Sequence, residues 1–254
     1  MQGEWLWRLR LSWLGTRYVG WQRQPNGLSI QQVVEEALSD ILGGQRVRVH
    51  AAGRTDAGVH AIEQLAAVKV KRVRREAHEL WRGLNARLPD DIACLGVDPA
   101  PRGFNPRGTI KLYRYRVLNR AARCPFRHDR AWHVREALDV EAMAAAARPL
   151  VGEHDFTSFR ASGCTAKHPV RTLLGAAVRR EGDEIHVEFE GNGFLRHQVR
   201  IMVGALVEVG AGRQPVDWLA ELLAARDRRL GARTAPAHGL WLVRARIPDE
   251  PPAE

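Results

Sequence analysis

The spacing of apolar and polar positions predicts a regular series of strands and helices in the first hundred residues. Strict alternation predicts strands, and apolar residues at helical spacing predict helices. The predicted strands span 5–13, 46–52, 60–71 and 91–100, and the predicted helices span 30–44 and 75–88. Ser29 and Gln32 have the spacing of a capping box at the start of the first helix. The resulting order, β-α-β-β-α-β, is typical of a ferredoxin-like or RRM-like fold.

The second half repeats this order of elements over a longer stretch without repeating the sequence. Strands are predicted at 110–119, within 171–191 on both sides of the turn 181–184, and at 239–247. Helices are predicted from near Asp139, at 195–210 and at 215–228. The pattern therefore predicts an α+β protein of two ferredoxin-like (RRM-like) halves, whose antiparallel sheets form one extended platform.

Proline and glycine gather at 98–108, which marks a loop and a seam between the two halves. We therefore expect an N-terminal domain at 1–103, a C-terminal domain at 104–248 and a flexible tail at 249–254. No apolar run approaches the roughly 18 residues that a membrane span needs, and the start of the chain lacks a secretory signal pattern. These features predict a soluble, cytoplasmic protein. The three cysteines are scattered, which predicts free thiols.

The formal net charge of +10 at pH 7 adds information about a partner. Only four of the 39 lysine and arginine residues are lysine. Arginine binds phosphate with two parallel hydrogen bonds and stacks on bases, so this composition favours a nucleic-acid partner. A genome-wide preference for arginine would explain the same composition without such a partner.

The segment Ala51–Ala61, AAGRTDAGVHA, concentrates reactive side chains in a loop between two predicted strands. Arg54 stands two residues before Asp56, and His60 stands four residues after it. A guanidinium beside a carboxylate favours the charged form, and an ionised aspartate acts as a nucleophile, a weak base or a stabiliser of positive charge. Thr-Asp-Ala-Gly is also a good turn sequence, so residue types alone leave both interpretations open.

Two further segments carry candidate binding groups. Arg196 and Arg200 are four residues apart at the start of a predicted helix, where they would grip a phosphate or form a solvated basic face. Tyr113 and Tyr115 point to one face of a strand, with rings that either stack on bases or pack in a core. The chain has no G-x-S-x-G, H-E-x-x-H or Walker motif, which weakens serine hydrolase, metalloenzyme and nucleoside-triphosphatase interpretations.

Seven segments, taken in order, resemble the signatures of the tRNA pseudouridine synthase A family over nearly the whole chain. They are GWQRQ (20–24), GRTDAGVHA (53–61), LPDDIA (88–93), YRYRV (113–117), HDFTSFRASGC (154–164), HQVRIMVG (197–204) and GLWLV (239–243). The resemblance implies an isomerase that flips uridines 38, 39 and 40 out of the tRNA anticodon stem-loop and converts them to pseudouridine with an aspartate nucleophile. It also implies a homodimer that needs no cofactor and no metal, with tRNA lying across both subunits.

The resemblance also implies roles for individual residues, carried over by matching motif. Asp56 is the implied catalytic aspartate, and Arg54 helps to displace the target base. Tyr113 packs against the target uracil, Arg200 pairs with Asp56, and Leu240 lines the uracil pocket. His60 is then expected to have a structural role in the strand that follows the loop.

The chain departs from the family pattern in two places. The family usually carries Tyr-Asp-Gly where this chain has Trp13, Leu14 and Gly15, and it often carries histidine where this chain has Asn105. Both positions lie outside the catalytic loop, so they concern tRNA contacts and not the reaction. Two alternatives from other classes stay open: a non-catalytic RNA-binding protein built on RRM-like sheets, and a metal-dependent hydrolase around Asp56 and His60.

Overall fold

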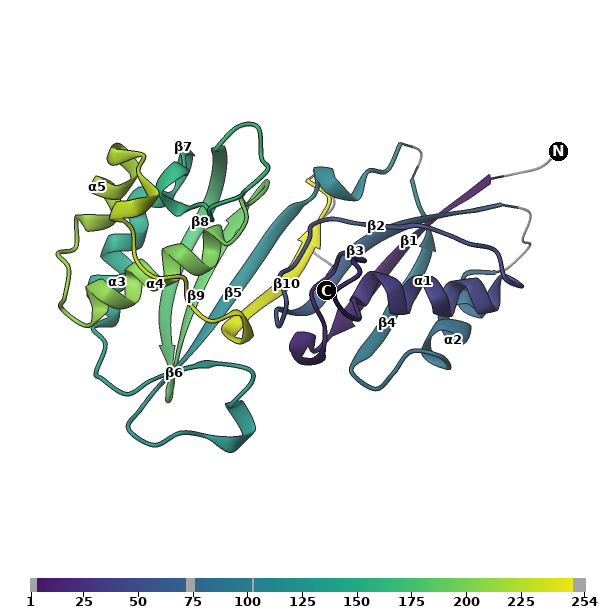
Figure 1. Cartoon of the computed structure of the whole chain (residues 1–254), viewed down its shortest axis with the longest axis horizontal. Helices are drawn as coiled ribbons and strands as arrows, with labels where there is room; N and C mark the ends of the chain where they lie inside the picture. The colour runs from purple at the N-terminus through teal and green to yellow at the C-terminus, as the bar shows by residue number, and fades with distance from the viewer. Residues whose placement is uncertain (1–3, 72–75, 102, 249–254) are drawn as a thin grey trace. The chain divides into compact units, whose positions relative to one another are not determined.

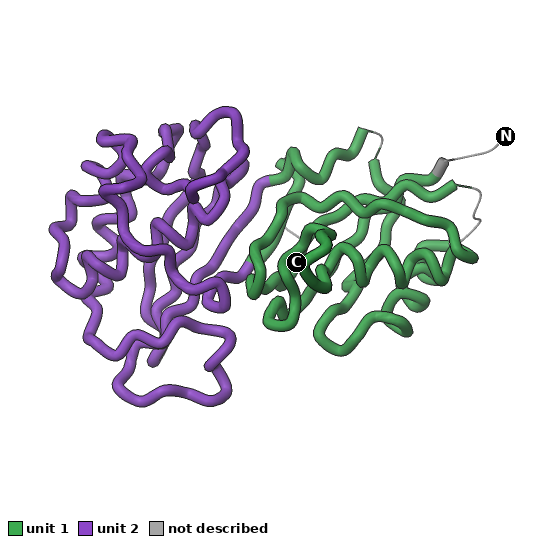
Figure 2. Tube along the Cα trace, viewed as in Figure 1, with its two compact units in different colours: residues 1–109, 242–254 green, residues 110–241 purple. Residues whose placement is uncertain are grey.

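The computed structural model describes residues 4–71, 76–101 and 103–248, and the chain divides into two compact units (Figure 1, Figure 2). Unit 1 consists of Met1–Thr109 with Leu242–Glu254, and unit 2 consists of Ile110–Trp241. The predicted tail, 249–254, lies outside the described residues. These compact units are not evidence that each part folds independently. The division into domains at 1–103 and 104–248 therefore stays a prediction.

Unit 1 has the predicted order of elements. They are β1 (Glu4–Trp13), α1 (Ile30–Ile41), β2 (Val49–Ala51), β3 (His60–Lys71), α2 (Ala77–Asn85) and β4 (Ile92–Pro99). Strand β10 (Leu240–Arg246), from the end of the chain, also pairs with β3, so the strand order in this unit is β4-β1-β3-β10. The strand β2 pairs with β3 as well and is shorter than the predicted strand. At the start of α1, the Ser29 hydroxyl accepts the Gln32 N–H at 3.2 Å, as the predicted cap requires.

The alternation along β1 separates a core face from a charged face. Leu9 and Leu11 are fully buried, and α1 and α2 cover one face of this sheet (Figure 1). Arg8 and Arg10 point to the opposite face, where Arg8 lies 3.7 Å from Asp98. The period of two therefore places the apolar residues under the helices and leaves arginines on the open side of the sheet.

Unit 2 contains the predicted elements and two additional short strands. They are β5 (Ile110–Asn119), β6 (Trp132–Val134), α3 (Val140–Ala147), β7 (Gly152–Asp155), β8 (Val170–Glu181), β9 (Glu184–Gly191), α4 (Gln198–Gly210) and α5 (Trp218–Ala225). The strand order is β5-β9-β8-β7, and β6 pairs in parallel with β5. Apart from β6 the pairs between strands of this unit are antiparallel, which confirms the predicted α+β class.

Two simpler predictions concern the cysteines and the membrane. Cys94, Cys124 and Cys164 are free thiols, as predicted. None of the helices in the described ranges combines the length and the apolar character needed to cross a membrane.

Ion pairs connect the strands of unit 2 on the sheet face that carries Arg114 and Arg116. Arg114 Nε lies 2.6 Å from a carboxylate oxygen of Glu188, and Arg116 Nε lies 2.8 Å from one of Glu184. Glu184 also accepts a hydrogen bond from His186 Nε2 at 2.9 Å. Burial raises the pKa of Glu184, but the hydrogen bonds from Arg116 and His186 outweigh burial and bring the pKa below its ordinary value of 4.5.

This pKa predicts that acid destabilises unit 2. A lowered pKa in the folded state means that the stabilisation by Glu184 is complete above the unfolded-state pKa of about 4.5 and is lost as the pH falls through the folded-state pKa. We expect urea unfolding to give a smaller free energy of unfolding at about pH 3.5 than at pH 7. The variant Glu184→Gln should be less stable at pH 7 and show a weaker pH dependence. An undiminished pH dependence in this variant would contradict the assignment.

Candidate active site

Asp56 lies in the tight loop between β2 and β3, and the segment after β1 holds the backbone of this loop. Trp21 N–H donates to Thr55 O at 3.1 Å, and Gly58 N–H donates to Tyr18 O at 3.3 Å. Gly58 has a φ of 80°, which confirms the turn that Thr-Asp-Ala-Gly predicts. The backbone on both sides of Asp56 is thus held by hydrogen bonds. Asp56 itself is only half-buried, so its side chain remains accessible.

Two glycines of the first loop allow it to approach the Asp56 loop closely. A Cβ atom on Gly20 would lie 2.4 Å from Thr55 O, and one on Gly15 would lie 2.1 Å from Val59 O. Gly20 also has a φ of 98°, which residues other than glycine rarely adopt. Trp13, one of the departures from the family pattern, donates from Nε1 to Val59 O at 3.1 Å. The first loop therefore supports the Asp56 loop through its backbone and through Trp13.

The two other polar residues of the motif have different environments. His60 is fully buried, and its Nδ1 accepts the N–H of Gly15 at 3.0 Å, which confirms the structural role expected for it. Arg54, by contrast, is exposed. The guanidinium of Arg54 is therefore accessible to a ligand.

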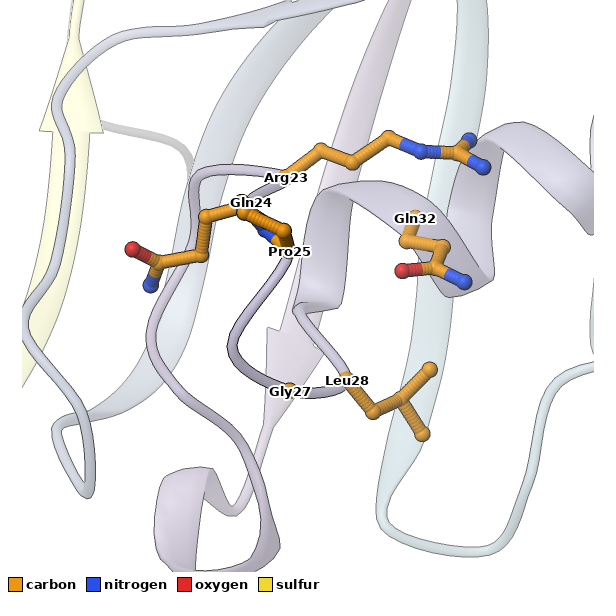
Figure 3. Close-up of a pocket in the computed structure, with 6 residues that line it drawn as sticks. All are labelled: Arg23, Gln24, Pro25, Gly27, Leu28 and Gln32. Atoms are coloured by element: carbon orange, nitrogen blue, oxygen red, sulfur yellow. The ribbon is translucent and has the colours of Figure 1, made fainter.

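An open pocket of about 590 Å³ lies beside α1 in unit 1 (Figure 3). The residues that line it are Arg23, Gln24, Pro25, Gly27, Leu28 and Gln32. Arg23 lies 3.4 Å from a carboxylate oxygen of Glu36, and Gln24 donates to Val19 O at 2.8 Å. The pocket includes the end of the GWQRQ segment but none of the predicted site residues, and protein contacts already engage these polar groups.

In unit 2, Tyr113 and Tyr115 lie on the same face of β5, as the alternation predicts. Tyr113 is 8% exposed and Tyr115 is fully buried. The ring of Tyr113 packs edge-on against Phe194, with ring centroids 5.1 Å apart. Both tyrosines are therefore buried, Tyr115 completely and Tyr113 almost completely.

Arg200 of α4 holds the chain segment that leads to Leu240. Its Nε donates to Ala235 O at 2.8 Å, and Ala235 N–H donates back to the Arg200 carbonyl at 3.1 Å. The hydroxyl of Tyr115 donates to Pro236 O at 2.7 Å. Leu240 follows this segment as the first residue of β10 and is 6% exposed. Hydrogen bonds from Arg200 and Tyr115 thus hold residues 235 and 236, which lead along the chain to Leu240.

The prediction for the start of this helix was wrong. His197 has a left-handed φ of 63°, and α4 begins only at Gln198. Arg196 therefore precedes the helix and does not share a helical face with Arg200. Eleven of the 13 residues of α4 are buried, so it is a central helix and not a solvated basic one.

Lys111 is a residue that sequence reasoning overlooked. It lies on the same face of β5 as Tyr113, is 5% exposed, and donates from Nζ to Asn192 O at 3.2 Å. Burial lowers the pKa of its ammonium group to about 8. The alternation in I-K-L-Y-R-Y would have identified it, because residues two apart on a strand share a face.

Comparison with known proteins gives a consistent result over most of the chain. The sequence profile of a family described as "tRNA pseudouridine synthase" matches residues 12–107 and 146–248. A tRNA pseudouridine synthase A of Myxococcus xanthus is 48% identical over 97% of this chain and 93% of its own length. The protein of the same name from Acidiphilium cryptum (strain JF-5) is 48% identical over 96% of this chain and 97% of its own length. That from Geotalea uraniireducens (strain Rf4) is 45% identical over 93% of this chain and 97% of its own length. With its motifs in order, its α+β fold and these relatives, the chain belongs to the tRNA pseudouridine synthase A family, whose members are isomerases that act on uridines in tRNA.

Proposed function

We propose that this isomerase converts uridines 38, 39 and 40 of the tRNA anticodon stem-loop to pseudouridine, with Asp56 as the nucleophile. The observation that carries the proposal is the environment of Asp56. This half-buried carboxylate lies on a loop whose backbone is hydrogen-bonded to the segment after β1 both before and after Asp56. A carboxylate on a fixed backbone can be held in line with a reacting carbon. Such positioning of the two reacting groups raises the rate of the reaction.

The reaction exchanges one bond for another within the nucleotide. The bond between N1 of uracil and C1′ of ribose breaks, a bond between C5 and C1′ forms, C5 loses its proton and N1 gains one. Asp56 attacks either C1′ or C6 of the uracil ring to begin this exchange, and both routes need an ionised carboxylate. The target base must first leave the helical stack, at a cost of a few kcal/mol.

The other site residues have proposed roles in the state in which the target base has left the helical stack. The exposed guanidinium of Arg54 helps to displace the target base and to hold the RNA backbone. Tyr113 packs against the uracil, and the buried side chain of Leu240 lines the pocket. The role assigned to Arg200 is the one that the family resemblance implies, pairing with the carboxylate of Asp56. We further propose that the protein acts as a cytoplasmic homodimer, with one tRNA spanning both subunits.

The test is to incubate the purified protein with unmodified tRNA and to map pseudouridine by carbodiimide block and primer extension. We expect product at positions 38, 39 and 40 only. Product at other uridines would overturn the assigned positions, and binding without any product would favour the non-catalytic RNA-binding alternative. Addition of a chelator should leave product formation unchanged, whereas a metal-dependent hydrolase would lose its activity.

A further inference from the structure

The loop that joins β5 to β6, residues 120–131, presents an aromatic ring to solvent. Phe126 is 85% exposed, and among the described large apolar side chains that are exposed the next is Leu230 at 57%. A single exposed apolar side chain needs no explanation by itself. The backbone and the charges around Phe126 are what distinguish this loop.

The loop is tied to the sheet on both sides of Phe126. Arg120 Nη1 lies 3.0 Å from a carboxylate oxygen of Asp183, and Arg120 also donates to the carbonyls of residues 122 and 123. On the other side, Pro125–Arg127 forms a short 3-10 helix, and Arg127 forms an ion pair with the buried Glu184. The ring of Phe126 is therefore presented by an ordered backbone, which lowers the entropy lost when a partner binds.

The charge of the loop favours a polyanionic partner. Between residues 120 and 130 the sequence has four arginines and one histidine against one aspartate. Arg123 is exposed, so its guanidinium is accessible to a phosphate. A second copy of this protein would bring its own net charge of +10 toward the loop, whereas RNA brings phosphates.

The loop is also connected to the strand that carries Leu240. The indole Nε1 of Trp241 donates to Arg130 O at 3.0 Å, and the guanidinium of Arg116 lies 5.5 Å from the centroid of the Trp241 ring. Leu240 directly precedes Trp241 in the chain. A nucleotide bound at the loop would therefore be held at a fixed place relative to the unit 2 part of the candidate site.

We propose that Phe126 stacks on an unpaired nucleobase of the tRNA substrate while Arg123 contacts a neighbouring phosphate. Aromatic side chains that present a free face are the usual platforms for unpaired bases in RNA-binding proteins. The inference rests on tRNA as the substrate, and it adds a contact outside the pocket for the target uridine.

The test compares the affinity of Phe126 variants for unmodified tRNA by filter binding. Because the side chain is exposed, Phe126→Ala should fold normally and raise the Kd about tenfold, while Phe126→Trp should keep the original Kd. Arg123→Gln should weaken binding and reduce the slope of log Kd against log salt by about one. Leu230→Ala, at an exposed apolar side chain outside this loop, serves as the matched control and should leave the Kd unchanged.

Two results would overturn the proposal. One is a Kd for Phe126→Ala equal to that of the unaltered protein. The other is a change of oligomeric state in Phe126→Ala, seen by sedimentation, because it would assign the ring to contact with a second copy of the chain. Failure of the proposed target positions is distinguishable, since pseudouridine would then map elsewhere while the effect of Phe126 on the Kd persists.

Discussion

Replacement of Asp56 by asparagine should abolish pseudouridine formation while tRNA binding is retained. The amide has nearly the same shape as the carboxylate but is not a nucleophile, so we expect the rate to fall at least about a thousandfold. The affinity for tRNA should stay equal or increase, because the substitution removes a negative charge from a surface that approaches phosphates. Release of tritium from C5-labelled uridine in tRNA measures the reaction, and filter binding measures the affinity.

The matched control for this variant is Asp40→Asn. Asp40 is an exposed aspartate near the end of α1 in the same unit, so its replacement makes the same chemical change away from the loop. We expect both rate and affinity to be unchanged. Normal tritium release by Asp56→Asn would show that this carboxylate is not the nucleophile, whatever its effect on binding.

Replacement of Gly20 by alanine should damage the catalytic loop without touching any reactive group. The added Cβ would lie 2.4 Å from Thr55 O and 2.9 Å from the carbonyl carbon of Asp56, and the φ of 98° is unfavourable for alanine. We expect a loss of stability of roughly 2 kcal/mol from strain and collision. The displaced Asp56 should lower the rate by about a hundredfold, because a shift of about 1 Å at a reacting group has that effect.

Gly43→Ala separates the effect of backbone strain from that of displacement. Gly43 also has a positive φ, 65°, but a Cβ atom there would meet nothing within 4 Å. This variant should lose about 1 kcal/mol in thermal or urea unfolding and keep its full rate. If Gly20→Ala and Gly43→Ala reduced the rate equally, contact between the first loop and the Asp56 loop would not be what positions Asp56.

The elements that the sequence predicted best are those in which local pattern and burial agree. The strands at 60–71 and 110–119 have the bounds that the pattern predicted. Burial alternates along most of β5, whereas β3 buries residues 64–68 consecutively and alternates only toward its end. The short strands β6 and β7 were missed, since three or four residues carry too little alternation and become strands only through their neighbours. The pairing of β10 with β3 depends on segments that are far apart in sequence, which no local pattern encodes.

Proximity in sequence was a weaker guide to side-chain contact. Arg54 and Asp56 are two residues apart, but the side chain of Arg54 is exposed whereas that of Asp56 is half-buried. Arg196 and Arg200 were expected on one helical face, and the left-handed His197 delays the helix and separates them. In both cases the backbone conformation of a single turn decides where the side chains lie.

By itself the sequence determined the family, the α+β class and the loop that carries Asp56, because these depend on residue types in a fixed order. The tertiary structure decided what supports that loop and which polar residues are structural. The close approach of Gly15 and Gly20, and the hydrogen bond that engages His60, exist only once the first loop packs against the turn. The same is true of the ordered loop that presents Phe126, since its anchors, Asp183 and Glu184, lie more than fifty residues away in the chain. Contacts between such distant segments arise from packing, and a local sequence pattern cannot specify them.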